Sequence, residues 1–375
     1  MLFTDKYFSK ARAIAKHAGL NPEVSYRFFA RTNGIAAMEP FKLMVQKLLG
    51  DKASVLTYPE GHFFEAGDTL AILKGKFQDI VEYEPMLLWW AILPSHCAKQ
   101  AFDIAESSQD IALCQKRDID VIAMENRHNF GGEVTALTSY GAKVGGIQLS
   151  SCEIATNPLA YLEFMLDEVY KPLIENPRTW CNTDKAIGTM PHALLAIFKG
   201  DYALACQAYK SCFPEDKIIV LNDYNNREID DSLIALKVLG ADLYGVRCDT
   251  CGENYPQLSI GLPPTERYSR GISKELVQNL RRFLDEHNGT HVKICVSSGF
   301  DSKKIDDYFY SPIDIIGTGS FIPKWPMATA DIFEVEGIFE TKKGREWGFQ
   351  RNFFLEKKLF HDFSSLNCLE IDNAE

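Results

Sequence analysis

The fold class can be read from residues 218–246, whose sequence is IIVLNDYNNREIDDSLIALKVLGADLYGV. This stretch begins and ends with an apolar run, IIVL and LYGV, and such runs are typical of short buried strands. Between them, Leu233 and Leu236 follow the spacing of a helix, and Gly240 is placed to end it. A strand, a helix and a second strand in this order predict parallel pairing.

The same alternation extends to both sides of this unit. Further apolar runs occur at residues 121–124, 146–149, 186–190, 292–296 and 313–316. Between two of them, Leu276, Leu280 and Leu284 lie four residues apart, as on one face of a helix. Seven strand candidates within about 200 residues predict a (β/α) barrel. A doubly wound open sheet alternates in the same way and stays an alternative.

The N-terminal part has a different pattern. Residues 64–77 predict a strand–turn–strand unit, and Pro85 is placed to open an apolar helix at 86–93. Residues 332–339 alternate like a strand, so we expect the C-terminal segment to return to the N-terminal part. The chain is therefore predicted to be α/β, with an N-terminal α/β sandwich domain, a (β/α) barrel and a returning C-terminal segment at residues 1–115, 116–322 and 323–375.

Composition limits the possible partners. The 375 residues include 40 Lys and Arg against 51 Asp and Glu, and the resulting net charge of -11 opposes non-specific binding to nucleic acid or to anionic membranes. The ten cysteines are scattered along the chain, several within apolar runs, as reduced buried thiols are. The start has no signal-peptide pattern, and no apolar run reaches the roughly 18 residues that a membrane span needs. We expect a cytoplasmic protein.

The most specific motif is IGTMPHAL at residues 187–194, which holds Thr189 and His192. It places the histidine at the carboxyl end of a predicted strand and at the start of a predicted helix, 193–209, where a barrel carries its active site and a helix dipole favours phosphate. A histidine that only caps the helix is the alternative. The motif resembles that of the nicotinate phosphoribosyltransferase family, related to the quinolinate phosphoribosyltransferases; both are type II phosphoribosyltransferases. The resemblance implies that ATP phosphorylates His192.

A second motif, YGVRCDTCGE at residues 244–253, resembles another stretch of the same family. The resemblance implies that Arg247 helps to bind anionic ligands and that Asp249 faces the ribose. Glu253 stands where the family has aspartate, so the match weakens after Asp249. Cys248 and Cys251 also form a C-x-x-C pair, but a structural zinc site needs four ligands and the sequence has no second such pair. We predict no protein-bound metal.

Asp223 lies in VLNDYNN at residues 220–226, which resembles a family motif with a second aspartate where this chain has Asn226. Carboxylates at the ends of neighbouring strands can stabilise the positive charge that develops on ribose as pyrophosphate leaves. We therefore expect Asp223 to act in catalysis, and a carboxylate that merely caps its loop is the alternative.

Two glycine-bearing segments follow the last two strand candidates and resemble the family's phosphate-binding loops. Glycine lets backbone N–H groups approach phosphate oxygens, and barrels commonly bind phosphate at these two strand ends. The candidate phosphate-binding residues are Ser297, Ser298, Gly299, Gly317, Thr318 and Gly319.

Two further substrate-binding candidates rest mainly on the resemblance. Arg127 in ENRH follows the first barrel strand, where a guanidinium can bind a carboxylate or a phosphate in bidentate fashion. Tyr7 in TDKYF resembles a tyrosine that stacks on the pyridine ring from a neighbouring subunit, although it can equally be a packing aromatic. Glu84 fits the N-terminal pattern of the quinolinate enzymes or a charged first helical turn. Residues 157–180 are foreign to the family pattern and predict an inserted helix.

Together these resemblances imply an enzyme of NAD biosynthesis. It would join nicotinate to phosphoribosyl pyrophosphate, giving nicotinate mononucleotide and pyrophosphate, with Mg²⁺ on the pyrophosphate and ATP as a co-substrate that forms a phosphohistidine. A homodimer or a larger homo-oligomer is implied as well. Quinolinate and nicotinamide phosphoribosyltransferase remain alternatives, as does a barrel that binds a phosphorylated ligand without turning it over.

Overall fold

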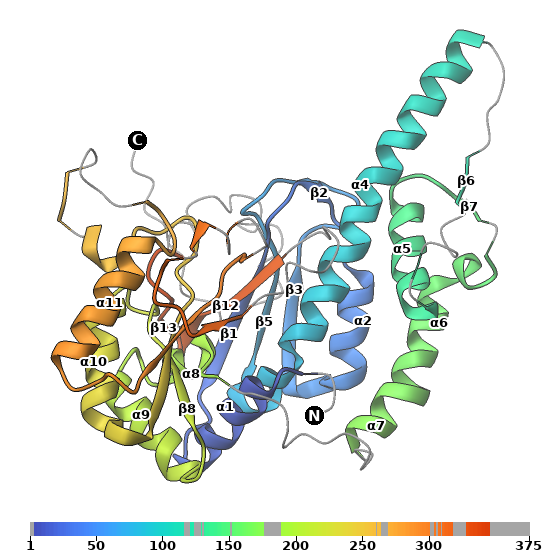
Figure 1. The fold of residues 1–375 in the computed structure, drawn as a ribbon. Helices are drawn as coiled ribbons and strands as arrows, with labels where there is room; N and C mark the ends of the chain where they lie inside the picture. The colour runs from blue at the N-terminus through green and yellow to red at the C-terminus, as the bar shows by residue number, and fades with distance from the viewer. Residues whose placement is uncertain are drawn as a thin grey trace, which may run out of the picture.

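The computed structural model describes residues 4–115, 121–123, 129, 131–150, 152–175, 189–259, 261–263, 269–300, 304, 307–308, 310–317 and 328–345. Its main elements are an antiparallel sheet built from both ends of the chain, a parallel sheet with its helices, and a helical region beside a long helix that projects from the molecule (Figure 1).

The antiparallel sheet has the strand order β13-β12-β1-β5-β3. Its strands are β1 (Glu23–Ala30), β3 (Ala53–Thr57), β5 (Thr69–Lys76), β12 (Ala328–Val335) and β13 (Ile338–Phe339). Strand β1 is buried over most of its length and pairs with β5 on one side and with β12 on the other, with Phe29 opposite Thr329. The C-terminal strands therefore lie in the N-terminal sheet, as the alternation at 332–339 predicted. The exact boundaries at residues 115 and 322 stay a prediction.

The strand–turn–strand unit predicted at residues 64–77 is confirmed, and its two strands pair with different partners. Strand β4 (Phe63–Phe64) pairs with β2 (Gly34–Ile35), whereas β5 pairs with β1 and β3. The turn between β4 and β5 binds the end of β1 instead, because Gly67 N donates to Ala30 O and Ala30 N donates to Asp68 O. Non-local backbone bonds thus fix the position of this unit.

Three helices lie in the N-terminal part, α1 (Lys6–His17), α2 (Glu39–Leu48) and the short α3 (Phe77–Ile80), and they are followed by the long α4 (Glu84–Gln115). The helix predicted at 86–93 is part of α4, which continues past Pro94. Helix α5 (Gly132–Val144) packs closely at this point, because a Cβ on Gly141 would lie 2.2 Å from Pro94 O. Tight tertiary packing therefore outweighs the local cost of a proline within the helix.

The parallel sheet has the order β11-β10-β9-β8, with β8 (Ile218–Leu221), β9 (Leu243–Cys248), β10 (Lys293–Val296) and β11 (Ile315–Ile316). Its order follows the chain, as in a barrel, whereas a doubly wound sheet reverses direction. Met190 N donates to Ile219 O, so the chain before α8 runs along the free edge of β8. The two remaining parallel strands, β6 (Ile122–Ala123) and β7 (Leu149–Ser150), pair with each other. Within the described ranges no strand pairing joins them to the larger sheet, and a closed barrel is not observed.

Helices α10 (Glu228–Leu239) and α11 (Lys274–Glu286) connect strands of the parallel sheet. Gly240 ends α10 with a φ of 55°, as predicted. The single helix predicted at 193–209 is wrong, because α8 (His192–Ile197) and α9 (Tyr202–Cys212) are separate. The helical conformation is interrupted between them, where Lys199 and Gly200 have φ values of 53° and 72°.

The insertion predicted as helical contains α6 (Pro158–Met165), the π-helical turn η5 (Leu166–Tyr170) and α7 (Lys171–Glu175). It lies beside α5 and α2, and Lys47 of α2 is 2.6 Å from Glu163 and 2.8 Å from Asp167. Across the residues that the structure describes, no helix has the length and hydropathy of a membrane span.

Candidate active site

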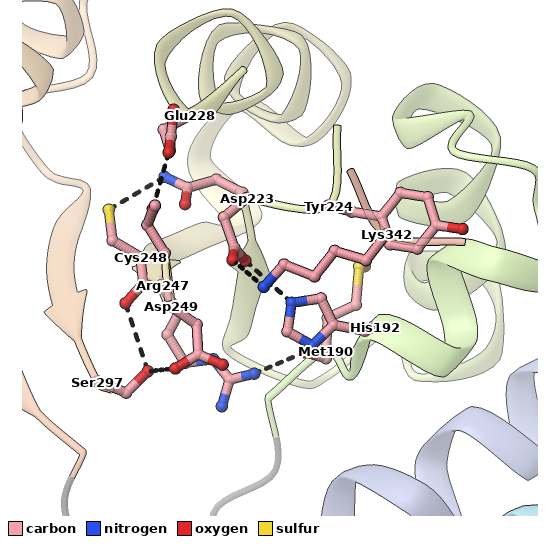
Figure 2. Close-up of polar contacts among 12 residues, drawn as sticks. Met190, His192, Asp223, Tyr224, Glu228, Arg247, Cys248, Asp249, Ser297 and Lys342 are labelled. Carbon is pink, nitrogen blue, oxygen red and sulfur yellow. Dashed lines mark hydrogen bonds and ion pairs between the residues drawn. The ribbon is translucent and has the colours of Figure 1, made fainter. Parts of the chain in front are cut away.

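A pocket of about 130 Å³ lies where the carboxyl ends of the parallel strands meet α8, α1 and β12. Polar residues follow the ends of neighbouring strands: Asp223 lies just after β8, Arg247 and Asp249 at the end of β9, and Ser297 directly after β10. Parallel strands end at one edge of their sheet, and for this reason sequence-distant side chains gather here (Figure 2).

Asp223 is fully buried and contacts two cations or potential cations. Its Oδ1 lies 3.1 Å from His192 Nε2, and its Oδ2 accepts a hydrogen bond from Lys342 Nζ (Figure 2). Burial alone would raise the pKa of Asp223, but Lys342 and His192 together lower it below its ordinary value. Asp223 is therefore an ionised carboxylate with both oxygens bonded.

The contact with Asp223 selects one tautomer of His192. An ionised carboxylate can only accept hydrogen bonds, so a neutral His192 must carry its proton on Nε2. The lone pair is then on Nδ1. Because His192 is the first residue of α8 and about a quarter of its side chain is exposed, this ring can meet a ligand in the pocket.

Arg247 offers the pocket a guanidinium with spare donors. Its Nη2 donates to Met190 O at 3.3 Å, and its buried Nε has no hydrogen-bond partner. No carboxylate of the described part of the chain forms an ion pair with it. A guanidinium in this condition is suited to an anionic ligand.

Asp249 is oriented by the loop after β10. Ser297 Oγ lies 2.6 Å from Asp249 Oδ1, to which it donates, and 3.3 Å from Cys248 O. Ser298 and Gly299 follow with φ values of 71° and 73°, a left-handed pair that turns the loop sharply.

The second predicted phosphate loop begins next to the first. Gly317 N donates to Val296 O at 2.8 Å, and a Cβ on Gly317 would lie 3.4 Å from Ser297 Cβ. The two loops are therefore neighbours at their origins. Three of the predicted site residues, Thr318, Gly319 and Arg127, lie outside the described residues.

Tyr7 lines the pocket from the same chain. The resemblance implied a tyrosine from a neighbouring subunit, but α1 brings Tyr7 to the pocket without one. Its hydroxyl donates to Asp5 at 2.9 Å, and burial, together with Asp5 and Glu84, raises the pKa of Tyr7. Burial also raises the pKa of Glu84 well above its ordinary value, and Asp331 adds to this. The raised pKa values favour the neutral, protonated forms of Tyr7 and Glu84 on this side of the pocket.

The departures from the family pattern have structural roles. Glu253 forms an ion pair with Arg31 of the antiparallel sheet, and although burial opposes the charge, Cys251 and Arg31 lower the pKa of Glu253 to about 2. Asn226 has a φ of 54°, a left-handed conformation that asparagine tolerates better than most residues.

The C-x-x-C pair forms no metal site in the structure as described. Cys248 Sγ accepts a hydrogen bond from Asn222 Nδ2 at 3.3 Å, and burial raises the pKa of both Cys248 and Cys251. A raised pKa disfavours the thiolate that binds zinc. The described residues contain no group of three or more His, Cys, Asp or Glu that could hold a metal ion.

Sequence reasoning missed Lys342 and Asp331, which line the same pocket. Lys342 belongs to the run TKKGR at 341–345, and such a run is normally a solvated surface segment. Asp331 lies on β12, whose place beside β1 is set by long-range pairing. Neither residue has a local sequence signal that points to a site.

Comparison with solved structures identifies the fold. A nicotinate phosphoribosyltransferase from Vibrio cholerae is similar at 15% sequence identity, over 91% of this chain and 87% of that chain, with a TM-score of 0.51. The chain has the nicotinate phosphoribosyltransferase fold. The resemblance stated from the sequence motifs is thus confirmed at the level of the fold.

Two other solved structures align with this phosphoribosyltransferase fold over most of the chain. They are nicotinate-nucleotide pyrophosphorylase from Pyrococcus furiosus, at 23% identity over 91% of this chain and 77% of that one with a TM-score of 0.40, and human nicotinic acid phosphoribosyltransferase, at 16% identity over 90% and 76% with a TM-score of 0.36. Likeness at this level adds nothing to the fold assignment. No protein-family model and no curated protein matches the sequence significantly.

Proposed function

We propose that the chain is a phosphoribosyltransferase of NAD metabolism and that its base substrate is nicotinate. The observation that carries this proposal is the convergence of His192, Asp249 and Arg247, whose Nε has no partner, on one pocket within this fold. Asp223 lies behind this pocket and contacts His192. In this proposal the carboxylate of nicotinate pairs with Arg247, and the phosphates of phosphoribosyl pyrophosphate bind at the loops after β10 and β11.

In the proposed reaction the pyridine nitrogen attacks the anomeric carbon of the ribose as the carbon–oxygen bond to pyrophosphate breaks. The bonding electrons leave with pyrophosphate, and positive charge develops on the ribose in between. Asp249, held by Ser297, is placed to stabilise this charge. Mg²⁺ would enter with the pyrophosphate as part of the substrate, since divalent magnesium usually keeps phosphate and water ligands. The chain itself works by positioning and electrostatics.

We also infer the finer features implied by the sequence motifs. The parallel strands close into a barrel. His192 Nδ1 attacks the γ-phosphorus of ATP, and the bond from that phosphorus to the bridging oxygen breaks as ADP leaves. The enzyme acts as a homodimer or larger homo-oligomer in the cytoplasm. The bare Nδ1 of the tautomer that Asp223 selects supports the second of these inferences.

The decisive experiment is pyrophosphate release measured in parallel with nicotinate, nicotinamide and quinolinate, each with and without ATP. We expect turnover with nicotinate and stimulation by ATP. If only nicotinamide or only quinolinate is turned over, that base and not nicotinate is the substrate. Binding of phosphoribosyl pyrophosphate without turnover of any base would contradict the enzymatic proposal and favour a non-catalytic binding protein.

A further inference from the structure

Lys342 is buried in the pocket although it belongs to a charged run. Only 3% of its side chain is exposed, and its ammonium donates to Asp223 Oδ2, the oxygen that His192 does not use. Its neighbour Lys343 is exposed. The chain thus buries one lysine of a Lys-Lys pair against the carboxylate that contacts the candidate phosphoryl acceptor (Figure 2).

The segment that carries Lys342 contacts the loops after β8 and β9 and strand β12. Lys343 N donates to Tyr224 O at 3.0 Å, and Asn254 Nδ2 donates to Lys343 O at 2.9 Å. Arg345 Nε lies 3.3 Å from Asp331 of β12. These bonds define the segment's path, so the position of Lys342 is determined by its surroundings.

We propose that Lys342 is a positioning residue for His192, because it holds Asp223 as a charged acceptor and thereby keeps the proton on Nε2 and the lone pair on Nδ1 of a neutral imidazole. This deepens the proposed function, since it explains how the histidine is prepared as a nucleophile. Lys342 does so without forming a bond to the histidine.

Charge balance explains the need for a third group. With His192 alone, the buried negative charge of Asp223 would be neutralised best by an imidazolium, whose Nδ1 carries a proton and cannot attack ATP. Lys342 supplies the compensating positive charge permanently. Burial opposes its charge, but Asp223, and then Asp249, raise the pKa of Lys342 above its ordinary value, so it stays an ammonium at neutral pH.

Other ionisable groups also line the pocket around His192. They are Glu84 of α4, Asp331 of β12, Arg247 and Asp249 at the end of β9, Tyr7 of α1 and Tyr224 after β8. Asp249 also interacts with the charge of Lys342, so Lys342→Arg, which keeps that charge, is the matched control.

The test measures the ¹⁵N NMR signals of the His192 imidazole as a function of pH in full-length protein with ¹⁵N-labelled histidines. The His192→Gln variant lacks these signals and so assigns them. In Lys342→Met, the titration midpoint of this ring should rise by about one pH unit or more relative to wild type, because Asp223 then recruits the imidazolium as its counter-ion. Lys342→Arg should keep the midpoint near that of wild type. Lys343→Met, which removes one exposed positive charge at the adjacent residue, should leave the midpoint unchanged.

Equal midpoints in wild type and Lys342→Met would overturn the proposal, as would an equal rise in Lys343→Met. If Lys342→Met does not fold, Lys342→Gln decides by the same criterion, because its amide can still donate to Asp223 without carrying charge. The titration needs neither substrate nor turnover. The absence of pyrophosphate release with every base would therefore contradict the proposed function without affecting the result on Lys342. Pyrophosphate release together with equal midpoints in wild type and Lys342→Met would contradict the role of Lys342 alone.

Discussion

Asp223 and His192, 31 positions apart, form a 3.1 Å contact that joins the end of strand β8 to the first residue of helix α8. The carboxylate determines which ring nitrogen of the histidine carries the proton. A histidine prepared in this way can accept a phosphoryl group without taking part in the displacement at ribose.

We predict that His192→Ala abolishes ATP stimulation and the incorporation of acid-labile phosphate, while slow nucleotide formation persists at high phosphoribosyl pyrophosphate. In the proposed reaction the nitrogen of nicotinate is the nucleophile, so we expect the histidine to couple ATP to transfer and not to act as a general base. Labelling with γ-³²P ATP and pyrophosphate release measure the two effects. Exposed His287→Ala serves as control. Loss of all transfer in a folded His192→Ala protein would show a direct catalytic role.

Arg247→Ala should narrow the preference for nicotinate over nicotinamide. A guanidinium poised for a carboxylate is left unpaired by the neutral amide, and loss of such a charge-assisted bond costs about 2 kcal/mol, or roughly thirtyfold. The ratio of kcat/KM for the two bases is the measurement, and Arg282→Ala on the exposed face of α11 is the control. An unchanged ratio would show that another cation binds the nicotinate carboxylate, and Arg127 is the candidate from the sequence.

Ser297→Ala should lower kcat/KM by about tenfold to a hundredfold, because a hydrogen bond to a charged acceptor contributes about 1.5 to 3 kcal/mol. Ser297 donates to Asp249 Oδ1 at 2.6 Å, and its loss frees the carboxylate to rotate. Steady-state kinetics with both substrates would measure the effect. Ser54→Ala, at an exposed strand position, should have none. Wild-type kinetics in Ser297→Ala would contradict the role given to Asp249.

Gly344→Ala should lower both stability and activity, whereas Gly337→Ala should lower stability alone. Both glycines have a positive φ, 84° and 75°, so each alanine carries a similar backbone cost of about 1 to 2 kcal/mol. Only at Gly344 would the new Cβ overlap another group, at 1.9 Å from Asn254 Oδ1, and so displace the segment that carries Lys342. Denaturant unfolding and pyrophosphate release separate the two effects. Equal activity in the two variants would argue against a role for this segment.

Asp231→Asn should stabilise the protein at pH 8. Burial raises the pKa of Asp231 from 3.8 to about 7, so the folded state binds this proton more tightly than the unfolded state does. Its contribution to stability is complete below pH 3.8 and is lost as pH rises toward 7. One pKa unit corresponds to about 1.4 kcal/mol, so a shift from 3.8 to about 7 sets an upper limit of about 4 kcal/mol for the gain at pH 8. The free energy of unfolding against pH measures it, with exposed Asp230→Asn as control. A gain independent of pH would point to another cause.

The parallel strands and most of the site could be predicted because their signals are local. Apolar runs at 218–221, 243–246 and 292–296 became β8, β9 and β10, and polar residues directly after each run had to gather at one sheet edge. His192, Asp223, Arg247, Asp249 and Ser297 were found together for this reason.

Features that depend on distant parts of the chain were missed. The sequence indicated two strands with a turn at Gly67 and Asp68, but it did not indicate the backbone bonds from this turn to Ala30. Pro94 looked like a helix end, but a close-packed α5 carries α4 past it. Lys342 looked like a surface charge, because nothing near it in sequence indicates that Asp223, 119 positions away, is its partner.

The return of β12 to the antiparallel sheet has a consequence for synthesis on the ribosome. Strand β1 keeps an open edge until residues 328–335 emerge, after the parallel strands and their helices have already been made. Asp331 and Lys342 arrive in that same late stretch. A nascent chain therefore completes its N-terminal sheet and its pocket only after residues 328–342 have emerged, and a chain cut short before this point has neither a complete sheet nor a complete pocket.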